Sequence, residues 1–379
     1  MQFEVSKNTL LKAISNVNGA VEKKNTIPVL QNIRIDVNNQ ITEPVVSLSA
    51  TDMDVLITSK FKADIVRSGS TTVSAQMFFD IVRKVPENTE IVIMQDSPNI
   101  LQIRYGKSKF NLPCIDPTEF PDISEGELGE QISIAGSSFA RMIDKTRFAI
   151  SNDETRYHLN GIYLQLFNNP EKANEAEGKS LELRTVATDG HRLSLSFLEI
   201  DCKIPFGVII PKKTVAEIRR VVEGVDNIII SVSDIKIKLI CGDTTIISKL
   251  IDGDFPPYDK VVPKNNNQIV IVNKKSLFDS VDRVATIATD KHRSIKLNFE
   301  NNKLVLQATS NESGFAYEEI DISYSGEPIE TGFNARYLLD IINQIDKEEL
   351  MIRFKDGLSP AIIEAKELSS LFVIMPIRV

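Results

Sequence analysis

The sequence is poor in the residues that build metal centres and disulfide frameworks. Its 379 residues include only three cysteines and three histidines. Cys114, Cys202 and Cys241 lie far apart and form no CxxC pair, which argues against a disulfide framework and a cysteine zinc site. The histidines show neither HxxxH nor HExxH spacing, so a zinc hydrolase is not expected. We therefore expect no metal, no cofactor and a reduced, cytoplasmic type of chain.

Long apolar runs and phosphate-binding loops are also missing. Apolar runs such as Ile228–Ile230 and Leu371–Met375 fall far below the ~18 residues of a membrane span. No basic segment leads into an apolar stretch at the amino terminus, so no secretory signal is expected. The chain contains neither a Walker-type glycine loop nor GxGxxG, which disfavours nucleotide chemistry.

Two pairs of aspartates are the main candidates for catalysis. Asp52 and Asp54, and likewise Asp252 and Asp254, could bind a divalent metal in a nuclease or nucleotidyl transferase. Acids beside turns more often cap backbone amides, however. Metal-dependent catalysis is therefore the alternative hypothesis, and a generic scaffold is a third.

The most informative feature is a pattern of three segments that occurs three times in the same order. The offset from Ala50 to Ala187 is 137 positions, as is the offset from Asp80 to Glu217. Each copy has a short alternating strand, a polar cap and a helix, then a turn after a β-rich stretch, then a second helix. The recurring segments are Phe3–Ile14, Ile132–Ile143 and Ile269–Val281; Ala50–Asp52, Ala187–Asp189 and Ala308–Ser310; and Phe78–Val82, Val215–Arg219 and Leu338–Ile342.

This repetition predicts three copies of one domain, although three unrelated domains are the alternative. We place the domains at 1–127, 128–259 and 260–379. Helices that follow strands without regular βαβ alternation predict an α+β fold, in which two helices per domain cover one face of antiparallel sheets. The six predicted helices are 6–18, 75–85, 136–147, 211–223, 273–284 and 333–345.

Charge is distributed unevenly between the predicted helices and the rest of the chain. The six helices contain 15 Lys and Arg but only seven Asp and Glu, whereas the whole chain has a net charge of −8. Basic helices in an acidic protein suggest one positive surface that faces a polyanion. Solvated amphipathic helices are the alternative for any single helix. Because aromatic residues are sparse on these helices, backbone contact with a duplex is expected rather than base stacking.

Several ordered motifs resemble the bacterial DNA polymerase III beta subunit family, the replicative sliding clamps, over the whole chain. The resemblance implies a head-to-tail homodimer of three-domain protomers, closed into a six-domain ring around duplex DNA. It implies no catalysis, and partners that include the replicative polymerase, the clamp loader, repair polymerases and mismatch-repair proteins. The motifs are Thr26–Leu30, Arg156–Gly161, Arg184–Leu193, Asp252–Tyr258 and Val373–Val379.

The resemblance also implies two kinds of ligand contact. Matching DNA contacts are Lys24, Arg156, Tyr157 and His158, although Lys24 could be a solvated loop charge. A pocket for short partner peptides is expected between the second and third domains, beside an irregular carboxyl-terminal tail. Its matching residues are Leu159, Thr188, Gly190, His191, Arg192, Leu193, Pro256, Val261, Leu358, Pro360, Val373, Ile374, Met375, Pro376, Ile377 and Arg378. The turn around His191 could instead be only a tight turn, and Met375 could belong to the core.

The head-to-tail joint would pair the first domain of one protomer with the third domain of the other. Gly314, Phe315 and Tyr317 stand where the family usually has acids, so apolar and aromatic contact is expected to contribute more and ion pairs less. The matching basic edge is Arg104, Lys107, Lys109 and Phe110, and the matching acidic edge is Ile287, Glu312, Glu318 and Glu319.

Overall fold

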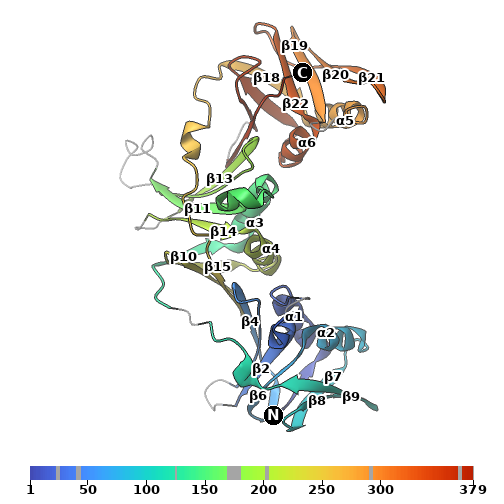
Figure 1. Cartoon of the computed structure of the whole chain (residues 1–379), viewed down its shortest axis with the longest axis vertical. Helices are drawn as coiled ribbons and strands as arrows, with labels where there is room; N and C mark the ends of the chain where they lie inside the picture. The colour runs from blue at the N-terminus through green and yellow to red at the C-terminus, as the bar shows by residue number, and fades with distance from the viewer. Residues whose placement is uncertain are drawn as a thin grey trace. The chain divides into compact units, whose positions relative to one another are not determined.

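The computed structural model describes residues 1–22, 26–39, 44–123, 126–168, 181–200, 205–289, 293–365 and 369–378. It contains six α-helices within this part of the chain, two in each repeat (Figure 1). The chain folds into two compact units, each with its own core. Unit 1 comprises Met1–Ala140 and Lys213–Leu250, and unit 2 comprises Arg141–Lys212 and Ile251–Val379.

The same order of elements recurs three times along the chain. The first repeat contains β1 Gln2–Ser6, α1 Lys7–Asn18, β2 Asn32–Asn38, β3 Val45–Thr51, β4 Val55–Phe61, β5 Asp64–Arg67, β6 Gly69–Ser74, α2 Ala75–Lys84, β7 Glu90–Ser97, β8 Ile100–Tyr105 and β9 Ser108–Ile115. The second contains β10 Gln131–Ala135, α3 Gly136–Thr146, β11 Gly161–Asn168, β12 Leu181–Thr188, β13 Arg192–Ile200, β14 Gly207–Pro211, α4 Lys212–Val221, β15 Asn227–Val232, β16 Lys236–Cys241 and β17 Thr244–Lys249. The third contains β18 Gln268–Asn273, α5 Lys274–Ala285, β19 Ser294–Glu300, β20 Lys303–Ser310, β21 Gly314–Asp321, β22 Ile329–Asn334, α6 Ala335–Asn343, β23 Glu349–Phe354, β24 Ala361–Glu364 and β25 Ser370–Ile374.

All six predicted helices are confirmed, and their ends differ from the predicted ends by no more than two residues. Polar residues begin several of them as expected. The Ser6 hydroxyl accepts a hydrogen bond from the Thr9 amide, and the Asn334 side chain accepts from the amides of Arg336 and Tyr337. These side chains satisfy amides that have no partner inside the helix.

The strands form three antiparallel sheets, which confirms the predicted α+β class. Unit 1 contains a 13-stranded sheet of order β10-β15-β16-β17-β4-β3-β2-β6-β9-β8-β7-β1-β5. Unit 2 contains an 8-stranded sheet, β14-β11-β12-β13-β25-β24-β23-β18, and a 4-stranded sheet, β21-β20-β19-β22. Two of these strand pairs join successive repeats: β4 pairs with β17, and β13 pairs with β25.

Helices pack their apolar faces against these sheets. In the third repeat, Leu277 and Val281 of α5 and Leu338 and Ile342 of α6 are buried in one core with strands β18 to β20. Within the described residues, no helix is both long and apolar enough to cross a membrane.

Many of the helix cations are engaged in ion pairs, which refines the expectation of a free positive surface. The pairs are Lys7 with Glu87, Arg83 with Asp80, Arg141 and Lys145 with Asp346, Lys213 with Asp52, Arg220 with Glu217, and Arg283 with Glu318. Any attraction of these helices to a polyanion is therefore weaker than the count of charges suggests.

Candidate peptide pocket and exposed strand edges

Unit 2 contains an apolar cavity of about 160 Å³. It lies beside the turn between β12 and β13, where Gly190 has a φ of 89°, a conformation that side-chain-bearing residues rarely adopt. A Cβ at Gly190 would lie 2.7 Å from Nη1 of Arg156, the end of a flexible side chain that can move aside, so the positive φ and not the space requires glycine here. The residues that line the cavity are Leu159, Thr188, Gly190, Arg192, Leu193, Pro256, Tyr258, Val261, Val373 and Met375.

All of these lining residues except Tyr258 belong to the predicted pocket. Tyr258 is buried, and its hydroxyl donates to Oε1 of Gln165 at 2.7 Å and accepts from Arg184 at 3.3 Å. The sequence did carry a signal for it, because Tyr258 ends the apolar and aromatic motif that begins at Asp252. The predicted residues that do not line the cavity are His191, Leu358, Pro360, Ile374, Pro376, Ile377 and Arg378.

The predicted carboxyl-terminal tail is confirmed. Strand β25 ends at Ile374, and residues 375–378 form no regular element. The Met375 amide donates to the His191 carbonyl at 2.9 Å, and the Ile377 amide donates to the Gly332 carbonyl at 2.8 Å. Pro376 between them has no amide to donate. Ile374 itself is fully buried in the core, whereas Met375 forms part of the cavity wall.

Arg192 is a buried cation beside this cavity, and its guanidinium binds several partners. Its guanidinium donates to Asp189 Oδ2 at 3.1 Å, to Asp340 Oδ2 at 2.7 Å and to the Phe148 carbonyl at 2.8 Å. It also lies 4.4 Å from the ring centroid of Tyr337. One buried cation therefore fixes the turn before β13 to helix α6, and it holds one wall of the cavity rigid.

The predicted DNA contacts lie close to this pocket, except for Lys24, which is outside the described residues. Arg156, Tyr157 and His158 lie in the segment Glu154–Leu159, which consists of two short 3₁₀ turns separated by a kink at Arg156, where φ is −109° and ψ is 56°. The Tyr157 side chain is 56% exposed and meets the His158 ring edge-on at 5.7 Å. Arg156 donates to Asp153 at 2.9 Å, so its charge is partly neutralised.

The predicted joint residues lie on two exposed edges. Arg104, Lys107 and Lys109 are exposed on the β8–β9 hairpin, beside Phe110, which is 37% exposed and stacks on Tyr105. Among the residues that the structure describes, 108–111 of β9 pair only with β8, because β6 reaches β9 only at Cys114 and Ile115.

The acidic edge is organised around β21, the edge strand of its sheet. Glu312 is exposed in the preceding turn, and Ile287 is half-buried against the third-repeat core. Glu318 accepts hydrogen bonds from Arg283, which lower the pKa of its carboxyl. Glu319 lies 3.4 Å from Lys303. Two of the predicted acids therefore already have partners in their own chain, while Phe315 and Tyr317 are 61% and 54% exposed.

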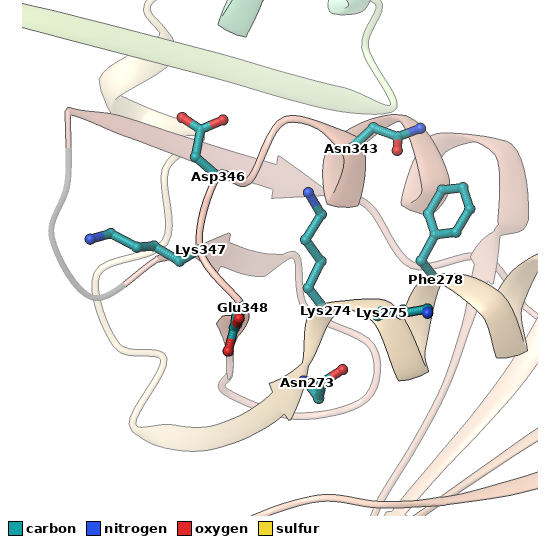
Figure 2. A pocket seen from close by; sticks show the side chains of 8 residues that line it. All are labelled: Asn273, Lys274, Lys275, Phe278, Asn343, Asp346, Lys347 and Glu348. Carbon is teal, nitrogen blue, oxygen red and sulfur yellow. The ribbon is translucent and has the colours of Figure 1, made fainter.

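A second, wider cavity of about 580 Å³ lies at the start of α5 and the segment after α6 (Figure 2). Its walls carry both signs of charge, with Lys274, Lys275 and Lys347 beside Asp346 and Glu348. The Lys274 ammonium donates to the Ile345 carbonyl, and Asp346 pairs with Lys145 and Arg141. These contacts hold the segment that follows α6, and this structural role accounts for the cluster of charges.

The first pair of aspartates, Asp52 and Asp54, has structural partners. Asp52 Oδ1 accepts from the amides of Asp54 and Val55, and its other oxygen pairs with Lys213. Burial opposes ionisation of Asp52, but these hydrogen bonds outweigh it and lower its pKa. Within the described residues, no cluster of three or more His, Cys, Asp or Glu side chains could hold a metal ion.

A threefold repeat, an apolar cavity and exposed strand edges are the features of a binding protein of the DNA-clamp type. The sequence matches the N-terminal, central and C-terminal domains of the DNA polymerase III beta subunit over residues 1–124, 133–257 and 259–378. The chain belongs to this family. It is a DNA sliding clamp that functions in replication, a processivity factor without catalytic activity.

The chain is similar to individual members of the family over their full length. The chain is 40% identical to the beta sliding clamp of Caulobacter vibrioides and 33% identical to that of Escherichia coli K12, with 100% of each chain covered. Among solved structures, the Caulobacter crescentus beta subunit has a TM-score of 0.91 at 40% identity. A sliding clamp from Bartonella birtlesii, solved bound to griselimycin, has a TM-score of 0.92 at 38% identity, and both structures are covered completely.

Proposed function

We propose that two copies of this chain close head to tail into a ring around duplex DNA, through pairing of β9 of one copy with β21 of the other. The strand pairs that join successive repeats carry this proposal. In both, the strand after the Ala-Thr-Asp turn pairs with the last strand of the following repeat, as β4 with β17 and β13 with β25. By the same rule, β21 should pair with the last strand of a following repeat. The strand equivalent to β17 and β25 is β9, which a second copy of the chain would supply.

The repeat also predicts the register of this intermolecular pair. Leu56, Leu193 and Phe315 occupy equivalent positions, because each pairs with the threonine of its preceding turn. Leu56 pairs with Ile247 across the first joint, and Ile247 corresponds to Asn111 in the β8–β9 hairpin. Phe315 should therefore lie opposite Asn111 of the second copy. The next two pairs follow as Ala316 with Phe110, and Tyr317 with Lys109.

This register explains the composition of the two edges. Phe110 and Phe315 would lose their exposure at the joint, and aromatic burial is a large favourable term in association. Glu318 would lie opposite Ser108. In the first joint, the equivalent Ser59 and Thr244 are bridged by Asn16 of α1. At the intermolecular joint, Arg283 of α5 would take the place of Asn16.

We assign the helices to the DNA-facing surface and Lys24, Arg156, Tyr157 and His158 to contacts at its rim. Partial neutralisation of the helix cations suits a ring that must slide, because tight phosphate pairs would release counterions and resist movement. The proposal keeps domain boundaries at 1–127, 128–259 and 260–379 and places the protein in the cytoplasm, where replication takes place.

We also assign the cavity in unit 2 to short peptide segments of partners, namely the polymerase, the clamp loader and repair proteins. Its lining is mostly aliphatic, and Thr188, Arg192 and Tyr258 supply the few polar groups, as in many peptide and ligand sites. Two similar clamps were solved bound to griselimycin, so clamps of this fold present at least one ligand site. A ring that encircles DNA and binds the polymerase raises the effective concentration of the polymerase on DNA, without a tight contact between the ring and either of them.

Retention on circular DNA tests the ring. Protein loaded onto nicked circular DNA should stay through a high-salt wash, because topology and not contact energy holds it. Linearising the circle should release it. Equal retention on circular and linear DNA would show that direct contacts hold the protein, and the sliding ring would be rejected. Solution mass gives a second measurement, since a particle of one-protomer mass at micromolar concentration contradicts the closed homodimer.

A further inference from the structure

The joint between the first two repeats contains a contact that the sequence did not predict. Arg220 on α4 donates from Nη1 to the Ser15 carbonyl and from Nη2 to the Asn16 carbonyl, each at 2.7 Å. Both carbonyls are in the second half of α1, and its last turn contains no basic residue. Glu217, one turn earlier on α4, accepts from Arg220 at 2.6 Å and orients it. A helix of the following repeat thus supplies the cation that stabilises the partial negative charge at the carboxyl end of α1.

An acid and an arginine occupy the equivalent positions of the first repeat, 137 positions earlier, as Asp80 and Arg83 of α2. They form the same pair, with Arg83 Nη2 at 3.3 Å from Asp80 Oδ1. Their side chains are more exposed than their counterparts, at 57% for Arg83 against 37% for Arg220, and 37% for Asp80 against 14% for Glu217. The pair on α2 is therefore already formed but has no neighbouring helix end to bind in its own chain, within the residues described.

The helix end that corresponds to α1 in the third repeat is the carboxyl end of α5. Ser15 and Asn16 correspond to Asp282 and Arg283, and the α1 cap residue Gly19 corresponds to Thr286, the cap residue of α5. In the single chain, the Thr286 hydroxyl donates to the Asp282 carbonyl at 3.3 Å. A carbonyl oxygen has a second lone pair, so Asp282 can still accept from an arginine.

Side-chain size supports this assignment independently. In the first joint, a Cβ at Gly19 would lie only 1.8 Å from Oε2 of Glu217, so that joint combines the longer acid with glycine. The predicted intermolecular joint combines a residue that has a Cβ, Thr286, with an acid that is one methylene shorter, Asp80. The joint that has a side chain at the cap position therefore has the shorter acid.

We propose that Asp80 and Arg83 of α2 form a clasp on the carboxyl end of α5 in the second copy, in which Arg83 donates to the carbonyls of Asp282 and Arg283 and Asp80 lies against Thr286. This inference rests on the proposed head-to-tail ring. The clasp adds a charged, directional contact beside the β9–β21 pair. It ties ring closure to two helices that the proposed function places at the DNA surface.

The dimer dissociation constant of Arg83→Ala tests the clasp. Hydrogen bonds from a charged donor stabilise by about 1.5–3 kcal/mol, so the constant should rise at least about tenfold in sedimentation or mass photometry. Lys84→Ala removes the neighbouring exposed cation of α2 and should change the constant less than about twofold. Arg220→Ala should lower thermal stability instead and leave the dimer unchanged.

A size exchange gives a second, independent measurement. Asp80→Glu alone should weaken the dimer, because the longer acid meets the Thr286 side chain. Adding Thr286→Gly should restore it by reproducing the first joint. Unfolding of each variant at a concentration where all are monomers shows whether the fold is intact.

The two hypotheses fail in different ways. Wild-type protein that stays monomeric would reject the proposed ring itself. Wild-type dimers with equal dissociation constants for Arg83→Ala and Lys84→Ala would overturn the clasp while the ring stands. Failure of Thr286→Gly to rescue Asp80→Glu in folded protein would likewise count against the clasp.

Discussion

Replacing Arg192 with methionine should loosen helix α6 and the peptide pocket together. Methionine keeps most of the apolar stem of the side chain but removes the guanidinium. Asp189 and Asp340 then lose their shared partner, and the Phe148 carbonyl loses its donor. The exposed fractions of the side chains are 9% for Arg192, 15% for Asp189 and 34% for Asp340, so at least one carboxylate is left in a poorly solvated position.

The size of the effect follows from these exposures. Breaking a buried ion pair by removing one partner costs about 3–5 kcal/mol. We expect about 3 kcal/mol here, at the low end of that range, because Asp340 is one-third exposed. The matched control is Arg156→Met, which removes an arginine paired with Asp153 in a site where both side chains are about 40% exposed. An exposed pair contributes about 0–1 kcal/mol.

Native-state hydrogen exchange is the suitable assay, because a chain of several domains need not unfold in one step. Amides of α6 should lose about 100-fold in protection in Arg192→Met, while amides of α2 provide an internal reference that should not change. Arg156→Met should change α6 protection less than about fivefold. Equal, small effects of both variants would show that the buried guanidinium does not hold α6, and our interpretation of Arg192 would be wrong.

Three further predictions follow from other parts of the chain. Deleting Met375–Val379 should weaken binding of a clamp-binding peptide at least about tenfold in fluorescence anisotropy, because Met375 lines the cavity. The deletion also removes two backbone hydrogen bonds, so the free energy of unfolding should fall by only about 2 kcal/mol. Unchanged affinity would contradict the pocket assignment. Replacing Phe110 and Ile287 with aspartate should give folded monomers that still bind peptide, and dimers at low micromolar concentration would mean that the joint is misplaced. Because the pKa of Asp52 is lowered in the folded state, its carboxylate stabilises the fold above pH 3.8, the pKa in the unfolded chain. This stabilisation is lost as the pH falls through the pKa of the folded state. Asp52→Asn should therefore flatten the acid limb of stability below about pH 4, and an identical pH profile would refute this role.

Local features of the sequence were sufficient to predict the elements of the fold. The helices follow from apolar residues at helical spacing after caps such as Ser6 and Asn334, and both signals lie within a few positions of each other. The threefold repeat then predicted the order of strands, since equivalent segments fold alike. The pocket lining was predicted by resemblance, and the turn at Gly190 is where its members from distant parts of the chain meet.

The charge pairs were beyond local inference. Lys145 and Asp346 are about 200 positions apart, and neither has a neighbour in sequence that identifies the other. For the same reason Arg192 was recognised as a pocket residue but not as the cation that binds Asp340. Charge counts by element therefore predicted which elements are basic, but they overestimated how much of that charge is free of acidic partners.

The joints differ in chemistry in a way that their connectivity explains. In the first joint, the hydroxyl and amide groups of Asn16, Ser59 and Thr244 and the contact of Arg220 with α1 lie beside the strand pair. The covalent link between these two repeats keeps their effective concentration high. An intermolecular joint must also offset the translational and rotational entropy lost on association. Exposed aromatic residues on β9 and β21 provide area for this joint to bury, and the acid–arginine pair on α2 would repeat the contact that Glu217 and Arg220 make in the first joint. The same connectivity makes this joint the place where a closed ring can open without unfolding a domain.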